Sequence, residues 1–488
     1  MQNLTSLFKN FWLKSQLPDR EPSKFSKIDK LIIFLVCIVI AIISSHKLLT
    51  NYPNDFGTIF EWLVTFVEVL VSCGLLILIS KKENPMINSR QILLIIGLLL
   101  LSQFIKVNFD NISPLVIVIP PALIISQGMG TLTALSWVSM AFINWPASVE
   151  GINNYLLVVT FICACVVSFL GGRIRNRAQF LQIAFLVPLG AFLSQLVLVG
   201  GNNQNTNLLN SSKLFLSKGD LFSDSLFLSI LLLVIILLMP IFESTFGLLT
   251  KSRLLELADQ EKPLLRRLSI QAPGTFEHTL LICCLAEEAT RTIGGDVDLI
   301  KTGALYHDIG KLHAPNWFIE NQDGKSNPHE ELNDPFKSAE ILQEHVDQGL
   351  IFARKNRLPQ AIANFIPEHQ GTLKMGYFLH KAKEKDINIS DDKFRYKGPI
   401  PQSKETAILM LADGCEAALR AMNIEASDKE ALHIISKIIT SREKDRQLVD
   451  SQLSKSEIFL IKRSFLNVWK RIRHRRIQYP TTENNTFS

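Results

Sequence analysis

Long apolar runs fill the first half of this 488-residue chain, and they restrict its fold more than any other feature. A helix that crosses the hydrocarbon core of a bilayer, about 30 Å thick, needs about 17 to 25 mostly apolar residues. Runs of that length lie near residues 31–49, 59–80, 91–108, 113–146, 154–171, 179–198 and 224–248. The run 113–146 is long enough for two spans; the alternative is one kinked or re-entrant segment around Gln127-Gly128-Met129-Gly130. The sequence therefore predicts a transmembrane domain of about eight helices between residues 31 and 250.

Lysine and arginine predict how these helices are oriented, because short loops rich in them stay on the cytoplasmic side. With a cytoplasmic N-terminus, positive charges concentrate in the segments expected inside, which are residues 1–30, 81–90, 173–177 and 251–253. The loops expected outside contain only Lys213 and Lys218. No cleavage site follows the first apolar run, so residues 1–30 are expected to be a cytoplasmic N-terminal segment. An even number of spans then places the downstream half in the cytoplasm as well.

Composition changes near Thr250, and nine of the ten histidines lie beyond it. In this second half apolar residues recur three and four apart, as in Leu281 and Leu285, which indicates amphipathic helices. Residues 251–480 are therefore expected to form an all-α domain, followed by a disordered tail over 481–488. The net charge of +6 is modest, and the positive-inside segments account for much of it. A nucleic-acid polymer is therefore not an expected partner.

The adjacent pair His307-Asp308 belongs to a series of histidines and aspartates in this half. The series is His278, His307, Asp308, His345, His369 and Asp413. Hydrolysis of a phosphodiester requires neutralisation of the phosphate charge and a water of lowered pKa, and two cations bridged by one carboxylate supply both. We expect Asp308 as the bridge, with His278, His307 and Asp413 around one ion and His345 and His369 around the other. Mixed imidazole and carboxylate ligands suit Fe or Mn.

Three more polar residues stand out from the sequence. Lys311 follows His307 by one turn if the segment is helical, so it is expected to reach a phosphate oxygen as a point charge. His329 is the other histidine expected to contact a phosphate. Glu68 lies within the run 59–80, where a carboxylate is costly. It is expected either to line a small-molecule pocket among the spans or to pair with a polar group on a neighbouring helix.

Several motifs around this series resemble one family. They are Ala272–His278, Phe318–Gln322, Asn327–His329, Phe394–Pro399, Pro401–Glu405, Leu411–Asp413 and, at the end of the last apolar run, Glu243–Gly247. They are similar to the signatures of the seven-transmembrane HD family, a membrane-bound branch of the His-Asp (HD) phosphohydrolase superfamily. The resemblance implies one span followed by a seven-helix bundle in the bacterial inner membrane, with a cytoplasmic all-helical HD domain.

The same resemblance implies an activity and a set of site residues. Members hydrolyse the second messenger cyclic di-AMP to the linear dinucleotide pApA, and two divalent metal ions would be held by the six residues of the series. Asp308 and Lys311 would be catalytic. Lys311, His329, Arg395 and Tyr396 would contact the cyclic dinucleotide.

This chain departs from the family pattern at two places. Gln370 stands where the family has a second histidine after the one matched by His369, and an amide is a poor metal ligand. Only Tyr52–Gly57 separates the first two apolar runs, where the family usually carries a large sensor domain. The alternatives are therefore hydrolysis of cyclic di-GMP or a nucleoside triphosphate, or a receptor that binds the dinucleotide without cleaving it. The cyclic di-GMP branch usually has Gly-Tyr-Pro where this chain has Gly376-Tyr377-Phe378. A homo-oligomer is a further expectation.

Overall fold

The computed structural model describes residues 27–51, 56–83, 87–109, 112–144, 154–201, 218–322, 326–385, 388–423 and 426–474. The predicted tail 481–488 and most of the predicted segment 1–30 lie outside these residues. Every regular element in the described ranges is a helix, and a single isolated antiparallel bridge joins Lys374 to Arg395. The predicted all-α class is confirmed. The chain divides after Arg253 into two compact units, and each is described separately below.

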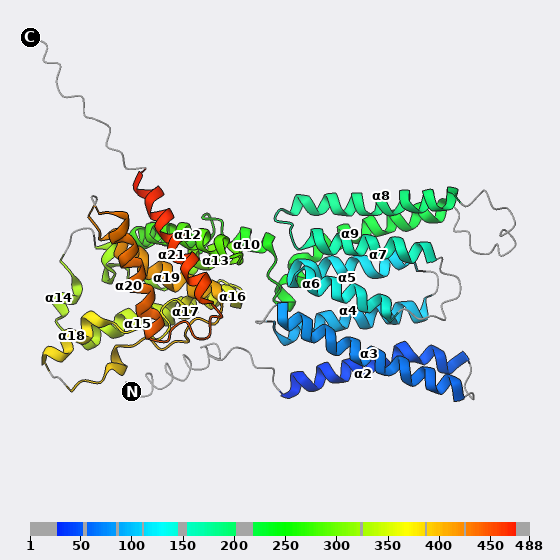
Figure 1. Ribbon diagram of the computed structural model, residues 1–488, viewed down its shortest axis with the longest axis horizontal. Coiled ribbons are helices and arrows are strands. Elements are labelled where there is room, and N and C mark those ends of the chain that lie inside the picture. The colour runs from blue at the N-terminus through cyan, green and yellow to red at the C-terminus, as the bar shows by residue number, and fades with distance from the viewer. Residues whose placement is uncertain are drawn as a thin grey trace, which may run out of the picture. The chain divides into compact units, whose positions relative to one another are not determined.

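The first unit consists of apolar helices (Figure 1). These are α2 (Lys27–Asn51), α3 (Phe56–Glu83), α4 (Ser89–Asn108), α5 (Pro114–Met129), α6 (Thr131–Ile143), α7 (Asn154–Gly171), α8 (Arg177–Gly201) and α9 (Lys218–Phe246). By length and composition, four segments can cross a membrane: Trp62–Glu83, Ser89–Lys106, Arg177–Val197 and Leu221–Phe246. Four shorter apolar segments, Lys30–Ile42, Pro114–Met129, Thr131–Ile143 and Tyr155–Gly171, accompany them.

The long run 113–146 divides into two helices at Gly130. This residue has φ of 105°, a left-handed conformation that favours glycine, and a Cβ there would lie 2.4 Å from Oε1 of Glu83. Glu83, at the end of α3, accepts hydrogen bonds from the backbone amides of Leu132 (3.0 Å) and Thr133 (2.5 Å). The carboxylate therefore caps the first turn of α6, where backbone amides have no partner within the helix.

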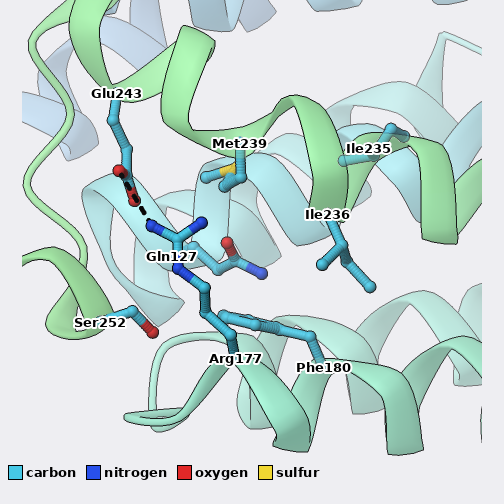
Figure 2. Close-up of a pocket in the computed structure, with 8 residues that line it drawn as sticks. All are labelled: Gln127, Arg177, Phe180, Ile235, Ile236, Met239, Glu243 and Ser252. Atoms are coloured by element: carbon cyan, nitrogen blue, oxygen red, sulfur yellow. Dashed lines mark ion pairs between the residues drawn. The ribbon is translucent and has the colours of Figure 1, made fainter.

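The segment that leaves α9 is held by side chains from other helices (Figure 2). Glu243 is buried, lies 3.9 Å from Nη2 of Arg177 on α8, and accepts a hydrogen bond from the hydroxyl of Thr250 at 2.5 Å. Gln91 on α4 donates to the carbonyl of Gly247 at 2.8 Å. Arg177 and Glu243 also line a small pocket with Gln127. The end of the last span is therefore fixed to the starts of α4 and α8.

Glu68 lies on the outer face of α3, with its side chain exposed. The face of α3 that packs into the unit carries Val69, Cys73 and Leu76, which are fully buried. Among the described residues of this single chain, Glu68 therefore neither lines the pocket formed by the spans nor pairs with a polar group on a neighbouring helix.

The second unit is built around α12 (Pro273–Ile293), which packs against α13 (Val297–Tyr306), α19 (Lys404–Arg420) and α21 (Lys455–His474). The other helices are α10 (Lys251–Leu257), α11 (Pro263–Gln271), α14 (Pro328–Leu332), α15 (Pro335–Lys355), α16 (Gln360–Ala363), α17 (Phe365–Glu368), α18 (Gly376–Lys385) and α20 (Asp428–Lys444). Short 3-10 turns η3 (Ile309–His313), η4 (Pro315–Trp317), η5 (Ile319–Asn321) and η6 (Asp391–Phe394) connect them.

Local sequence fixes where the central helices begin. Asp296 caps α13 by accepting from the amides of Asp298 and Leu299, and Asp334 caps α15 by accepting from those of Phe336 and Lys337. A reciprocal capping box between Ser403 and Thr406 starts α19. These caps fix the residue at which each helix starts, and so which residues of the helix face the candidate site.

Candidate active site

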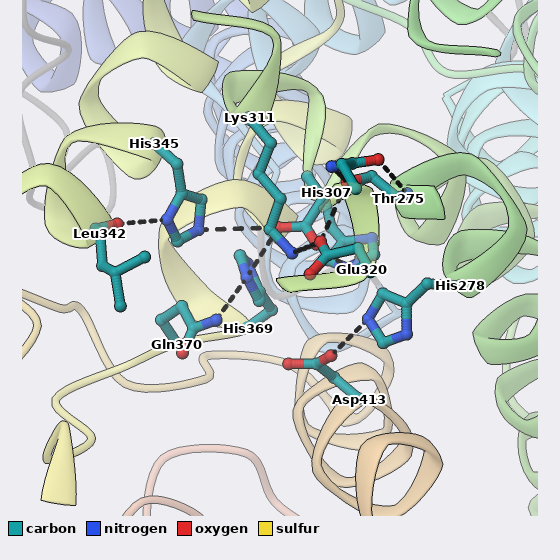
Figure 3. Close-up of polar contacts among 12 residues, drawn as sticks. Thr275, His278, His307, Lys311, Glu320, Leu342, His345, His369, Gln370 and Asp413 are labelled. Atoms are coloured by element: carbon teal, nitrogen blue, oxygen red, sulfur yellow. Dashed lines mark hydrogen bonds and ion pairs between the residues drawn. The ribbon is translucent and has the colours of Figure 1, made fainter. Parts of the chain in front are cut away.

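The buried carboxylate of Asp308 lies close to three imidazoles and one ammonium group, which belong to side chains labelled in Figure 3: His307, His345, His369 and Lys311. Its Oδ2 is 3.2 Å from Nε2 of His307 and 2.8 Å from Nζ of Lys311. Its Oδ1 is 3.6 Å from Nε2 of His345 and 3.5 Å from Nε2 of His369. Asp308 was predicted to lie at the centre of the site, and its carboxylate faces four other charged or polar side chains.

Four elements supply these side chains, and one glycine allows their close approach. His307 and Asp308 follow α13, Lys311 lies in η3, His345 lies on α15 and His369 follows α17. A Cβ at Gly310 would lie only 1.7 Å from the carbonyl oxygen of His345. Only glycine lets η3 pack directly on the α15 backbone, which brings Asp308 to His345.

Each of these three imidazoles is oriented by a backbone carbonyl. Nδ1 of His307 donates to the carbonyl of Ala304 at 2.6 Å, Nδ1 of His345 to that of Leu342 at 2.5 Å, and Nδ1 of His369 to that of Phe365 at 3.1 Å. These bonds place the proton on Nδ1 and leave Nε2 directed toward Asp308.

A second cluster joins α12 to α19 beside the first. Nε2 of His278 is 3.0 Å from Oδ1 of Asp413, and the ring centroids of His278 and His307 are 6.3 Å apart. The ligand atoms of His278, His307 and Asp413 lie within 4.8 Å of one another, as do those of His307, Asp308 and His369. Two neighbouring groups that share His307 therefore meet the size requirement for metal sites.

Unsatisfied buried atoms support the same assignment. Nε2 of His307, Oδ1 of Asp308 and Nε2 of His345 are buried and make no hydrogen bond to any described residue. A buried polar atom without a partner is costly, and a divalent cation would satisfy all three. The residues present therefore fit a metal centre, and the mixture of imidazole and carboxylate suits Fe or Mn.

The electrostatic surroundings of Asp308 and His345 favour the protonation states in which these side chains can bind a metal ion. Burial raises the pKa of Asp308, but His307 and Lys311 outweigh it and hold the pKa well below its usual range. Burial lowers the pKa of His345 to about 3, despite the opposing effect of Asp308. Asp308 is therefore a carboxylate and His345 a neutral imidazole at neutral pH, which are the forms that bind metal.

Lys311 is held between two carboxylates. Its Nζ is 2.6 Å from Oε1 of Glu320 and 2.8 Å from Oδ2 of Asp308. Glu320 also accepts a hydrogen bond from the hydroxyl of Thr275 at 2.9 Å. Lys311 lies in a 3-10 turn and not in the α-helix expected from its spacing to His307, yet its ammonium group reaches the site.

Two family descriptions match this chain in the order of its two units. Residues 59–250 match the family described as "7TM receptor with intracellular HD hydrolase", and residues 275–418 match the HD domain. Both parts of the architecture expected from the sequence, a seven-transmembrane region and an HD domain, are thus matched, and in the expected order. The six clustered ligand candidates all lie within the matched HD domain.

Several known proteins are similar to this HD protein. The cyclic-di-AMP phosphodiesterase PgpH of Bacillus subtilis is 31% identical over 450 residues, which are 88% of this chain and 61% of that protein. PgpH of Listeria monocytogenes is 39% identical over 242 residues, 50% of this chain and 33% of that protein. An uncharacterized protein of Synechocystis is 48% identical over 246 residues, 49% of this chain and 30% of that protein. The chain spans less than two thirds of the length of each of these relatives.

A solved structure also matches the second unit. The L. monocytogenes PgpH HD domain in complex with cyclic-di-AMP is 35% identical, with a TM-score of 0.43, and the match covers 44% of this chain and 99% of that one.

The residues expected to contact substrate occupy different surroundings in this HD protein. The Tyr396 ring lies 5.9 Å from that of His345, beside the metal-ligand cluster. The guanidinium of Arg395 instead donates to the carbonyl of Thr372 at 2.7 Å and lies 3.3 Å from Asp445. His329 packs between aromatic rings and lies with Nε2 3.0 Å from the carbonyl of Trp317. Only Tyr396 and Lys311 of the four contact the cluster directly.

Three glutamates near the site were not predicted from the sequence to have a role in it. Glu320 pairs with Lys311, Glu416 lies 2.5 Å from Nδ1 of His278, and Glu368 accepts hydrogen bonds from Thr406 (2.6 Å) and the amide of Gln402 (2.8 Å). Glu416 follows Asp413 by three residues and therefore lies on the same face of α19. That helical spacing was a usable signal, whereas Glu368 and Glu320 acquire their partners only through the tertiary fold.

Proposed function

We propose that this protein is a membrane-anchored, metal-dependent phosphodiesterase that hydrolyses cyclic di-AMP to linear pApA. The observation that carries the proposal is the buried Asp308 carboxylate, which faces three imidazoles and Lys311. The similarity to two PgpH proteins named as cyclic-di-AMP phosphodiesterases supports the choice of substrate.

The ligand roles follow from the two clusters. His278, His307 and Asp413 would hold one divalent ion, His345 and His369 the other, and Asp308 would be shared, with Fe or Mn as the proposed metals. Such ions neutralise phosphate charge and lower the pKa of an attacking water. Backbone carbonyls keep the imidazoles of His307, His345 and His369 oriented with Nε2 toward Asp308. The protein thereby supplies a preorganised set of ligands.

Lys311 would stabilise the negative charge that develops on the phosphate. Its side chain is 12% exposed and lies beside Asp308, and Glu320 fixes the position of the ammonium group. A charge-assisted hydrogen bond from Nζ to a phosphate oxygen is stronger in such a water-poor site than at the surface. Tyr396 would form part of the same wall of the site, since its ring lies against His345. We also propose that His329 and Arg395 contact the dinucleotide.

The cellular arrangement is also a proposal. Apolar helices long enough to cross a membrane support multi-pass insertion in the bacterial inner membrane. The bias of lysine and arginine toward residues 1–30, 81–90, 173–177 and 251–253 supports a cytoplasmic N-terminus and a cytoplasmic HD domain.

A second candidate function is a receptor that binds the dinucleotide without cleaving it. The observation that favours it is Gln370, whose Nε2 lies 3.0 Å from Nε2 of His369. The Gln370 amide thus contacts the His369 nitrogen that would face the second ion. Retention of all six ligand candidates in the two adjacent clusters supports the enzyme over the receptor.

The decisive experiment compares cyclic di-AMP, cyclic di-GMP and a nucleoside triphosphate as substrates of the full chain in lipid nanodiscs, with Mn²⁺ or Fe²⁺. Asp308→Ala is the control. We expect selective linearisation of cyclic di-AMP that Asp308→Ala abolishes. Binding without turnover would support the receptor, and preference for another substrate would retain the site but overturn the substrate assignment.

A further inference from the structure

His278 differs from the other imidazoles of the site in the group that orients it. His307, His345 and His369 each donate from Nδ1 to a backbone carbonyl. Nδ1 of His278 instead lies 2.5 Å from Oε2 of Glu416, a buried carboxylate on α19. The orientation of this one ligand therefore depends on a side chain that mutation can remove.

Glu416 is itself held in place. Nε of Arg420, one turn later on α19, donates to Oε1 of Glu416 at 2.8 Å, and Nη2 lies 2.7 Å from the same oxygen. Because Arg420 occupies Oε1, Oε2 is left for His278. Asp413 and Glu416, three residues apart on α19, thus contact the two nitrogens of the same ring, 3.0 Å from Nε2 and 2.5 Å from Nδ1.

We propose that Glu416 is a positioning residue for the metal centre. This inference rests on the proposed function, because it assigns Nε2 of His278 to a metal ion. With a metal ion bound, Glu416 would keep the proton on Nδ1, so that Nε2 of His278 would offer its lone pair to the ion beside Asp413. A carboxylate partner also makes the imidazole a more basic ligand than a carbonyl partner does.

The test measures Mn²⁺ affinity by calorimetry on metal-stripped full chain in nanodiscs. We expect Glu416→Ala to weaken one binding event about 10- to 100-fold. Glu416→Gln retains an acceptor for Nδ1–H without the charge, so its loss should be smaller. Arg420→Met should weaken the same event less than Glu416→Ala does. Glu287→Gln is the matched control, since Glu287 lies on α12 with His278 but pairs with Lys301 at 3.6 Å.

The outcomes separate this inference from the proposed function. A parent protein that binds no Mn²⁺ or Fe²⁺ overturns the metal centre itself. A parent that binds metal, with unchanged affinity in Glu416→Ala and Glu416→Gln, overturns the role of Glu416 alone. Thermal unfolding of the metal-free variants checks the fold, and a variant that fails to fold is replaced in the comparison by Glu416→Gln.

A separate observation concerns the outer face of α3. Val64, Glu68, Val71, Leu75 and Leu78 are all exposed, and they follow one another at spacings of four, three, four and three residues. This is the heptad spacing with which two parallel helices pack side by side. Within this pattern Glu68 occupies a core position of the seam.

Glu68 also lies at a depth where hydrocarbon is expected. It follows Trp62, where the apolar segment Trp62–Glu83 begins, by six residues and precedes Lys81 by thirteen. At 1.5 Å per residue these separations are about 9 Å and about 20 Å along the helix. A carboxyl group in this position is unfavourable against lipid tails and is stabilised by a partner that hydrogen-bonds it.

We infer that α3 pairs with α3 of a second copy of this chain, with the two Glu68 side chains in contact. Two copies in one membrane have the same topology, so a two-fold axis along the membrane normal makes the helices parallel and brings residues of equal depth together. One carboxyl then donates its proton to the carboxylate of the other. A single polar pair at a core position also fixes the register of the seam.

Cysteine crosslinking in native membranes tests this pairing. The variants are made in a Cys284→Ser background, because Cys284 is the exposed cysteine among the seven. Leu78→Cys should form an intermolecular disulfide on oxidation. Leu186→Cys on α8 is the matched control, since Leu78 and Leu186 are 65% and 64% exposed, and it should not crosslink.

Substitution of Glu68 then tests the seam. Glu68→Leu should weaken dimerisation about tenfold, measured by energy transfer between labelled copies in vesicles, whereas Glu68→Gln should retain it. Because the side chain is exposed, neither change disturbs the core of the unit. Equal crosslinking at both cysteine positions, a crosslinked species of another mass, or unchanged dimerisation in Glu68→Leu would each overturn the inference.

Discussion

The amide nitrogen of Gln370 lies 3.0 Å from Nε2 of His369. Since Nδ1 of His369 donates to the carbonyl of Phe365, the amide must donate to the lone pair of Nε2. The same lone pair would bind the second metal ion. Gln370 would therefore compete with such an ion for Nε2 of His369.

Replacement of Gln370 should relieve this competition. We expect Gln370→His to raise the affinity for the second Mn²⁺ at least tenfold, because an imidazole adds a ligand where the amide blocked one. Gln370→Ala should give a smaller gain, since it removes the competing hydrogen bond without adding a ligand. Calorimetric titration of the metal-stripped protein measures both, and unchanged affinity in both variants would show that residue 370 does not face the ion.

Removal of the Lys311 ammonium should slow turnover more than it weakens binding. A donor aimed at developing charge acts mainly in the transition state, so Lys311→Met is expected to lower kcat about 100-fold or more with little change in KM. Steady-state kinetics with cyclic di-AMP measures the two constants. Glu320→Gln, which leaves the ammonium in place but loosens it, should give an intermediate kcat. A rise in KM alone would mean that Lys311 binds substrate without stabilising the transition state.

A methyl group at Gly310 should disrupt the site by displacing the backbone that carries Asp308 and Lys311. A Cβ there would lie 1.7 Å from the carbonyl oxygen of His345 and displace η3 from α15. We expect Gly310→Ala to destabilise the HD domain by about 3 kcal/mol or more, at the upper end of overpacking effects. Gly376→Ala is the control, because a Cβ at Gly376 meets no atom within 4 Å. Thermal unfolding monitored by circular dichroism compares the two variants.

The sequence was sufficient to select the six ligand candidates because the chemistry of metal ligands is restrictive. A series of histidines and aspartates such as His307, Asp308 and Asp413 is uncommon outside metal sites. The structure brings all six candidates together. The apolar runs predicted the helices for a similar reason, since length and apolar composition leave few alternatives to a membrane span.

Partners and side-chain directions were not predictable in the same way. The pairs Glu416 with His278 and Arg395 with Asp445 join residues 138 and 50 positions apart, and glutamate and arginine are common at surfaces. The exposure of Glu68 depends on which face of α3 packs against its neighbours, which apolar composition does not distinguish. The η3 turn depends on Gly310 meeting the α15 backbone, a contact 35 residues away in the chain.

Removal of metal should lower the stability of the HD domain. Nε2 of His307, Oδ1 of Asp308 and Nε2 of His345 are buried without a hydrogen bond to any described residue, so the folded metal-free site carries an unfavourable free energy that an ion relieves. Ligand binding to the folded state alone stabilises by about 2.7 kcal/mol at a free concentration 100 times Kd. For a unit of this size we expect Mn²⁺ at that concentration to raise the midpoint of thermal unfolding by roughly 5 to 10 °C, reversed by a chelator. Asp308→Ala should abolish the shift, while an equal shift in that variant would place the bound ion elsewhere.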